Sequence, residues 1–102
     1  MVFDLDRKND LSVLRIEGEL DALSVVDLRP VIAKIGEDKP PKVLIDLSHL
    51  RLIDSSGVGA IVSMYKTVKA YQGDFAVVGA HDQPLAIFQL LRLDRVLLRD
   101  MA

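Results

Sequence analysis

The sequence contains no cysteine and only two histidines, His49 and His81. The absence of cysteine excludes disulfides, thiolate metal sites and a cysteine nucleophile. A serine nucleophile needs a general base within hydrogen-bond reach, and two imidazoles give few candidates for it. No pair of histidines shares a helical face, so no metal site is expected either. We interpret both histidines as ordinary surface side chains.

Long apolar runs and basic stripes are also missing. No apolar run approaches the ~20 residues that span a bilayer, and the first ten residues, MVFDLDRKND, lack the apolar core of a signal peptide. We therefore expect a cytoplasmic protein with no direct membrane insertion. The net charge is −2, with lysine and arginine scattered along the chain. This pattern makes nucleic acid an unsuitable partner.

The composition is that of a folded domain. The chain has 102 residues, of which 50% are hydrophobic and 27% charged. That length and balance predict one domain that buries its own core, without repeats or linkers.

The apolar spacing predicts strands and helices in alternation. Strands are expected at residues 2–6, 11–20, 42–47, 75–78 and 95–98. Helices are expected at residues 24–36, 56–72 and 82–91. The first two strands are expected to form an antiparallel hairpin. The order β-β-α-β-α-β-α-β predicts an α/β fold, with a mixed, mostly parallel sheet of four to five strands and about three helices.

Local signals refine the boundaries of these elements. Ser24 to Asp27 matches a capping box, in which the serine accepts from a backbone amide. Pro30 opposes a regular helix through that point, so the helix is expected to begin nearer Asp27, after a looser turn. Residues 48–51 are expected to form a turn, and Asp82 is expected to cap the last helix.

One stretch, LIDSSGVGAIV at residues 52–62, needs a chemical explanation. An apolar run ends in Asp54, Ser55 and Ser56, and an apolar helical pattern follows at once. The first interpretation is a nucleophilic serine. The nucleophile elbow is G-x-S-x-G, and neither serine has the required glycine two residues before it.

The second interpretation is a phosphate cradle at the start of the helix, where free amides favour anions. Gly57 and Gly59 lie there, but the Walker lysine is absent and Val62 stands where the dinucleotide-binding pattern needs its third glycine. A steric role is favoured for Gly59, which would let the helix approach the sheet closely.

The third interpretation treats a serine as the substrate of a modifying enzyme. One serine would be enough to cap the helix. The second leaves an exposed hydroxyl on a fixed backbone. Phosphorylation there would add ~1.5–2 negative charges beside Asp54, and the helix dipole would partly accommodate them.

The sequence resembles a known family over nearly its whole length. The segments GELDALSVVDLRPVI, VLIDLSHLRLIDSSGVGAIVSMYK, GDFAVVGA and IFQLLRLDRVL are similar to those of the bacterial STAS-domain anti-sigma factor antagonists. The D-S-S-G block after an apolar strand is the specific part of this resemblance. It implies that residues 1–102 form one STAS domain.

The resemblance also implies a function. Members of the family act as switches in partner exchange and are not enzymes. When unphosphorylated, such a domain binds an anti-sigma factor serine kinase of the histidine-kinase-like ATPase type and so releases a sigma factor. The kinase phosphorylates the domain on the first serine after the aspartate, and a PP2C-type phosphatase resets it.

Carried over by position, the phosphorylated residue is Ser55, with Asp54, Ser56 and Gly57 flanking the switch site. Asp21 matches a position near the partner-binding surface. The nucleotide belongs to the kinase, so no cofactor is implied, and a monomer is the simplest state. The alternative within the same fold is a non-switching docking subunit of a membrane transport system, such as a lipid-transport ATPase.

Overall fold

Two antiparallel strands open the fold as the hairpin pattern predicts, in a computed structural model that describes residues 1–99. Strand β1 (Val2–Lys8) pairs with β2 (Leu11–Leu20). Between them, Asn9 adopts φ 53°. Asparagine tolerates this left-handed conformation better than most residues, so a two-residue turn closes the hairpin.

Strand β2 organises the rest of the sheet. Strand β3 (Lys42–Asp46) runs parallel to the first half of β2, and β5 (Asp74–Val78) runs parallel to β3. The second half of β2 pairs in parallel with β4 (Leu50–Ile53). The register shifts between Gly18 and Glu19, where Gly18 takes φ 89°. Gly18 is paired with Leu50 and Glu19 with Leu52, so Arg51 is an extra residue on the β4 side of this ladder.

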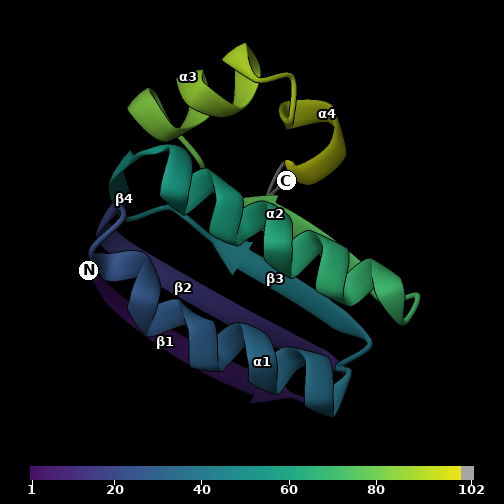
Figure 1. Cartoon of the computed structure of the whole chain (residues 1–102). Helices are drawn as coiled ribbons and strands as arrows, with labels where there is room; N and C mark the ends of the chain where they lie inside the picture. Colours follow the sequence, from purple (N-terminus) through teal and green to yellow (C-terminus); the bar gives the residue numbers. More distant parts are fainter. Residues whose placement is uncertain (100–102) are drawn as a thin grey trace.

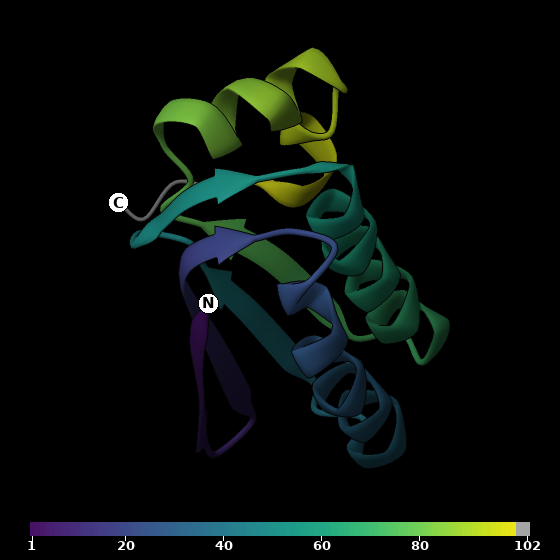
Figure 2. The ribbon, with the colours of Figure 1, turned by 60° about the vertical axis from the view of Figure 1, so that its left-hand side comes forward.

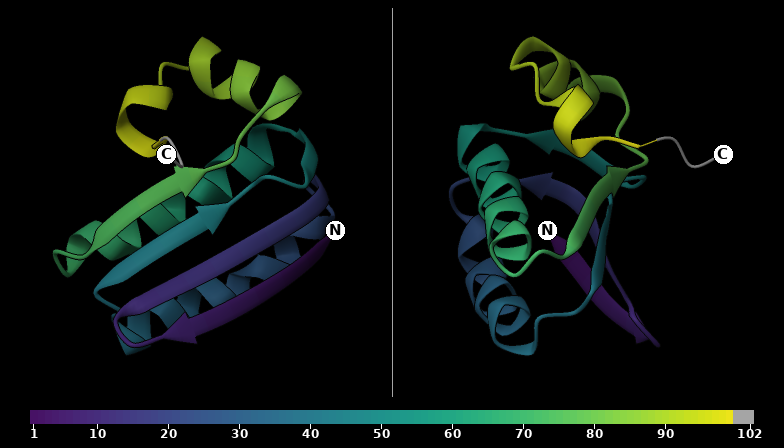
Figure 3. Two further views of the ribbon diagram at one scale, coloured as in Figure 1. Left: turned by 180° about the vertical axis from the view of Figure 1, so that it is seen from behind. Right: turned by 90° about the vertical axis from the view of Figure 1, so that its right-hand side faces the viewer.

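The helices complete the α/β fold. They are α1 (Arg29–Asp38), α2 (Ser55–Ala70), α3 (Asp82–Leu90) and the short α4 (Asp94–Leu97), with a 3-10 turn, η1 (Ser24–Leu28), leading into α1. Helices α1 and α2 cover one face of the sheet (Figure 1). The view from behind shows the strands in front of those helices (Figure 3, left). Helices α3 and α4 contact β4 and β5 and lie at one end of the molecule (Figure 2).

The core fills the space between the sheet and the two long helices. Apolar side chains that alternate along β2 and β3, together with the continuous apolar run of β5, meet the apolar face of α2. The largest fully buried side chains of this core include Leu14, Ile16, Ile45, Ile61, Met64 and Phe75. The first residue of α2 is thereby held at a fixed place beside the sheet.

Several local predictions need correction. Residues 95–98 do not form a strand, because α4 covers most of them and only Leu98 makes a single bridge to Val77. The predicted turn at residues 48–51 overlaps β4, whose first residue is Leu50. Asp82 is the first residue of α3, and its predicted capping role is wrong because the cap position is His81.

The loose start of the first helix is confirmed. The 3-10 turn η1 precedes α1, and Pro30 lies in the first turn of α1. A proline there removes no helical hydrogen bond. The capping box predicted from Ser24 to Asp27 is wrong, because the cap position of η1 is Leu23 and no side chain caps it.

Candidate functional site

The D-S-S-G block lies where strand β4 ends and helix α2 begins. The amide of Asp54 donates to the Leu20 carbonyl, at 3.1 Å, and so extends the ladder between β2 and β4. Its side-chain Oδ1 then accepts from the Gly57 amide at 2.9 Å. Asp54 is therefore the N-cap of α2. An acidic side chain at this position also interacts favourably with the helix dipole.

The two serines follow the cap inside the helix. Ser55 is the first residue of α2 and is exposed, whereas Ser56 is half-buried. Because Asp54 caps the helix, neither serine serves as its cap, contrary to the simplest expectation for a serine at a helix start. The Ser55 hydroxyl is therefore not needed to start the helix, because the bonds of Asp54 hold this part of the backbone.

Gly57 is the glycine that allows close packing. A Cβ built there would lie 2.6 Å from the Leu20 carbonyl oxygen and 2.7 Å from Cγ1 of Ile53. A Cβ at Gly59 would meet nothing within 4 Å. The steric role predicted for Gly59 is therefore wrong and belongs to Gly57. The amide of Gly57 is already engaged by Asp54, which removes it from any phosphate cradle.

Asp21 lies at the carboxyl end of β2 and organises the turn before η1. Its Oδ1 accepts from the amides of Leu23, at 3.1 Å, and Ser24, at 2.9 Å. In return, Ser24 Oγ accepts from the Asp21 amide at 2.9 Å. This reciprocal pair of bonds closes the turn before η1, three residues before the position of the predicted capping box. The Ser24 backbone and hydroxyl bonds lower the pKa of the Asp21 carboxyl.

A hydrogen bond that the sequence did not predict joins the two aspartate segments. The second carboxylate oxygen of Asp54 accepts from the Ala22 amide at 3.2 Å. One carboxylate therefore caps α2 and also ties the Asp21 turn to the switch segment. The structure brings Asp21, Asp54 and Ser55 to one end of the sheet. Leu23, at the tip of this turn, is 87% exposed.

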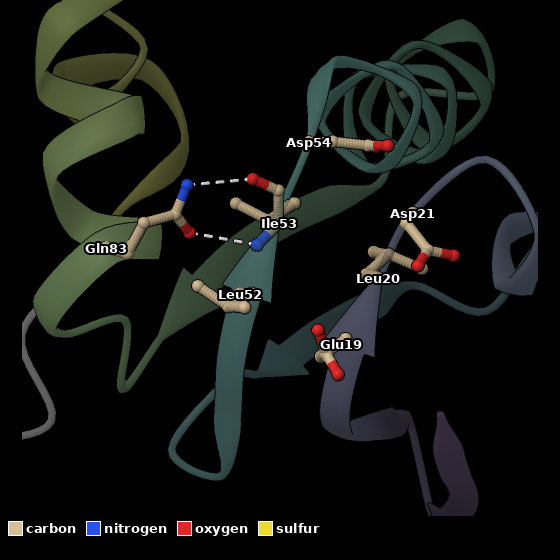
Figure 4. A pocket seen from close by; sticks show the side chains of 7 residues that line it. All are labelled: Glu19, Leu20, Asp21, Leu52, Ile53, Asp54 and Gln83. Carbon is tan, nitrogen blue, oxygen red and sulfur yellow. Dashed lines mark hydrogen bonds between the residues drawn. The ribbon is translucent and has the colours of Figure 1, made fainter.

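A cavity of about 250 Å³ adjoins this end of the sheet (Figure 4). Its lining residues are Glu19, Leu20, Asp21, Leu52, Ile53, Asp54 and Gln83. On its far wall, Gln83 of α3 donates to and accepts from the backbone of Ile53 (Figure 4). Sequence patterns gave no sign of this glutamine, because its partner lies 30 residues away.

The histidines do not complete a nucleophilic site. His49 is exposed. One ring nitrogen of His81 lies 2.8 Å from the Asp82 carboxylate and the other lies 2.7 Å from the Ser48 carbonyl oxygen. The Asp82 carboxylate, followed by the Ser48 carbonyl, raises the pKa of His81. Both ring nitrogens of His81 are bound to these groups, so His81 does not serve as a general base for Ser55.

Residues 1–99 contain no cluster of three or more histidine or acidic side chains that could hold a metal ion. No helix among them is both long and apolar enough to cross a membrane.

Comparison with known proteins places these features in a family. The STAS domain model matches residues 3–101. An anti-sigma-B factor antagonist of Staphylococcus aureus is 24% identical over 80 residues, which cover 78% of this chain and 74% of that protein. The crystal structure of an anti-sigma factor antagonist from Mycobacterium paratuberculosis superposes with a TM-score of 0.85 at 26% identity, covering 95% of this chain and 83% of the other.

Two more distant structures share the fold. The Bacillus cell fate determinant SpoIIAA, in its phosphorylated form, superposes with a TM-score of 0.80 at 23% identity, over 99% of this chain and 92% of the other. A sulfate transporter family protein from Wolinella succinogenes reaches 0.75 at 13% identity, over 90% of this chain and 79% of the other. At these identities the likeness concerns the fold alone.

Proposed function

This chain belongs to the STAS domain family, and on that premise we propose that it is a phosphorylation-controlled partner-switching regulator. Residues 1–102 act in the cytoplasm as one monomeric domain without enzymatic activity. The unphosphorylated domain binds an anti-sigma factor serine kinase of the histidine-kinase-like ATPase type, and this frees a sigma factor or another target. Phosphorylation of Ser55 ends that binding, and a PP2C-type phosphatase restores it.

The observation that carries this proposal is the exposed hydroxyl of Ser55 beside a completed helix cap. Asp54 caps α2 through its bond to the Gly57 amide, so no capping bond is lost when Ser55 is modified. Asp21 and the exposed Leu23 lie on the turn that Asp54 holds. The acceptor and a partner-facing turn therefore share one rigid surface. The anti-sigma factor antagonists among the relatives support the class of partner.

The proposed reaction needs only a hydroxyl from this chain. The Ser55 oxygen forms a bond to the γ-phosphorus of a nucleoside triphosphate held by the kinase. The bond from that phosphorus to the bridging oxygen breaks, the diphosphate leaves, and the hydroxyl proton passes to a base on the kinase. No cofactor on this chain takes part. The phosphatase reverses the modification by hydrolysis of the phosphoester.

The phosphate acts on the interface and leaves the fold unchanged. It brings ~1.5–2 negative charges to the first turn of α2, where the helix dipole favours anions. Asp54 and Asp21 already carry negative charge on that surface. A dianion that lacks a partner in the interface costs several kcal/mol. Because 1.4 kcal/mol is tenfold in affinity, we expect binding to weaken by ~10²-fold.

The first experiment identifies the partner. Ser55→Ala and Ser55→Asp proteins are used as baits in lysate of the native organism, and bound proteins are identified by mass spectrometry. Ser63→Asp is the matched control, because Ser63 is exposed on the same helix. We expect an ATPase-type kinase on the Ser55→Ala and Ser63→Asp baits and its loss from the Ser55→Asp bait.

The same experiment tests the alternative function. Subunits of a transport system held equally by all three baits would indicate a docking module, for which the fold shared with a sulfate transporter family protein is the precedent. Ser55 would then have no switching role, and the proposal would be rejected.

Peptide mapping tests the choice of serine. We expect the purified kinase to place phosphate on Ser55, because Ser56 is half-buried in a cavity of about 420 Å³ between α2 and η1–α1. Phosphate found on Ser56 would contradict this assignment. Circular dichroism of the modified protein should remain that of the unmodified one, since the cap stays intact.

Asp21 is proposed to contact the partner. Because its side chain also holds the turn before η1, the variant that tests this contact must keep those hydrogen bonds. Asp21→Ala would remove the bonds to Leu23 and Ser24, so weaker binding could follow from a loosened turn. Asp21→Asn removes the charge and retains a capping oxygen. We expect Asp21→Asn to bind the kinase more weakly while the domain stays folded, with a slightly lower thermal stability at neutral pH because the carboxylate's contribution is lost. Equal affinity of the wild type and Asp21→Asn for the kinase would show that the Asp21 charge does not contribute to the interface.

A further inference from the structure

Within residues 1–99, strand β4 has a strand neighbour on one edge only. It pairs with β2, and the edge on the other side faces helix α3. There, the Ile53 amide donates to Oε1 of Gln83 at 2.9 Å, and Nε2 of Gln83 donates to the Ile53 carbonyl at 2.9 Å (Figure 4). One side-chain amide therefore supplies the donor and the acceptor that a neighbouring strand would supply.

We propose that Gln83 is a positioning residue for Ser55. This inference rests on the proposed function, because it assigns to Gln83 the role of holding the phosphate acceptor in place for the kinase. Gln83 acts on Ile53, and Ile53 is joined through Asp54 to Ser55 at the start of α2.

The contacts around Ile53 explain why this bond matters. On the β2 side, the next residue is held by the bond from the Asp54 amide to the Leu20 carbonyl. A cavity of about 250 Å³ opens over the ends of β2 and β4, and Gln83 lines it from α3. The amide of Gln83 supplies a fixed, directional contact beside this space.

Holding the acceptor in place affects turnover more than binding. Phosphoryl transfer requires the attacking oxygen near and in line with the phosphorus, and a misplacement of about 1 Å can cost ~10²-fold in rate. A looser Ser55 segment therefore lowers kcat for phosphorylation and leaves KM almost unchanged. If Gln83 touched the kinase directly, its removal would raise KM. If Gln83 served only general stability, its removal would lower the unfolding free energy without affecting kcat or KM.

The first test is amide hydrogen exchange of the free protein, which needs no partner. Variants Gln83→Ala and Gln83→Glu are compared with Gln89→Ala, a control at an exposed glutamine near the other end of α3. We expect the protection of the Ile53 amide to fall about tenfold in Gln83→Ala, because it loses its partner. The amides of β3 should be unaffected. An unchanged Ile53 amide, or loss of protection throughout the sheet, would overturn the proposal.

The glutamate variant separates the two bonds. Its carboxylate can still accept from the Ile53 amide, but when ionised it has no proton to donate to the Ile53 carbonyl. The Ile53 amide should therefore stay more protected in Gln83→Glu than in Gln83→Ala. An equal loss of protection in both variants would contradict the bond from this amide to Oε1 of Gln83.

The second test is phosphorylation by the kinase recovered with the Ser55→Ala bait. We expect kcat to fall about tenfold or more in Gln83→Ala, with KM unchanged and Gln89→Ala at the wild-type rate. A raised KM at constant kcat, or no change in either constant, would overturn the positioning role. If no kinase is recovered, the proposed function fails, and the exchange result decides separately whether Gln83 fixes the Ser55 segment.

Discussion

Gly57 and Gly59, which lie two residues apart in α2, should respond oppositely to replacement by alanine. A Cβ at Gly57 would meet the Leu20 carbonyl oxygen at 2.6 Å and Cγ1 of Ile53 at 2.7 Å. A carbonyl in a strand cannot rotate away, so the first turn of the helix must move. At Gly59 the added methyl group would meet nothing within 4 Å.

The free-energy changes follow from these contacts. Overpacking at Gly57 costs ~1–3 kcal/mol, and distortion of the Asp54 cap adds up to ~1 kcal/mol. Alanine's higher helix propensity offsets about 1 kcal/mol. Gly57→Ala should therefore lower the unfolding free energy by about 2 kcal/mol. Gly59→Ala creates no new contact, so only the higher helix propensity of alanine counts. It should raise the unfolding free energy by ~0.5–1 kcal/mol.

Urea unfolding of the two variants and the wild type measures these differences. For a domain of this size, ~1 kcal/mol corresponds to 4–8 °C in Tm, so Gly57→Ala should melt roughly 10 °C lower and Gly59→Ala about 5 °C higher. The urea m-value should not change, since the surface exposed on unfolding is the same. A stable Gly57→Ala, or a destabilised Gly59→Ala, would refute the placement of Gly57 against the sheet.

Two further predictions concern pH. Bonds from Ser24 lower the pKa of Asp21, so its carboxylate stabilises the fold above the unfolded-state pKa, and that contribution is lost as pH falls through the folded-state value. Asp21→Asn should flatten the acid limb of the stability curve below pH ~4, measured by urea unfolding. The raised pKa of His81 contributes stability below its unfolded-state pKa, which is lost as pH rises through the folded-state value. NMR titration should give a lower pKa for His81 in Asp82→Asn, and an unchanged pKa would contradict their pairing.

The sequence predicted those parts of the fold that depend on local periodicity. Alternation gave the opening hairpin, and apolar runs gave β3 and β5. The D-S-S-G block was correctly placed at the junction of a strand and a helix. Each of these signals is carried by residues close together in the chain.

Strand β4 and the end of the chain depend on distant partners. Leu50 to Ile53 is too short to be recognised as a strand, and it pairs with the distant end of β2 across an irregular register at Gly18. Residues 95–98 are as apolar as a short strand, yet one helical turn forms there and only Leu98 reaches β5. No local pattern distinguishes these outcomes.

At the site, the unpredicted details are those set by helix phase and by side-chain partners. Gly57 is buried against the sheet, whereas Gly59 is exposed. Both glycines lie in the same short motif, and only the packing of α2 shows which one meets the sheet. The bonds between Asp21 and Ser24 likewise follow from the turn that the fold forms after β2.

The central claim is that phosphorylation of Ser55 controls one interface. Its most direct test is isothermal titration of the captured kinase, without nucleotide, into the unmodified protein and into protein phosphorylated on Ser55. We expect phosphorylation to weaken the affinity by ~10²-fold, while the circular dichroism of the two forms stays the same. Equal affinities for the two forms would contradict it.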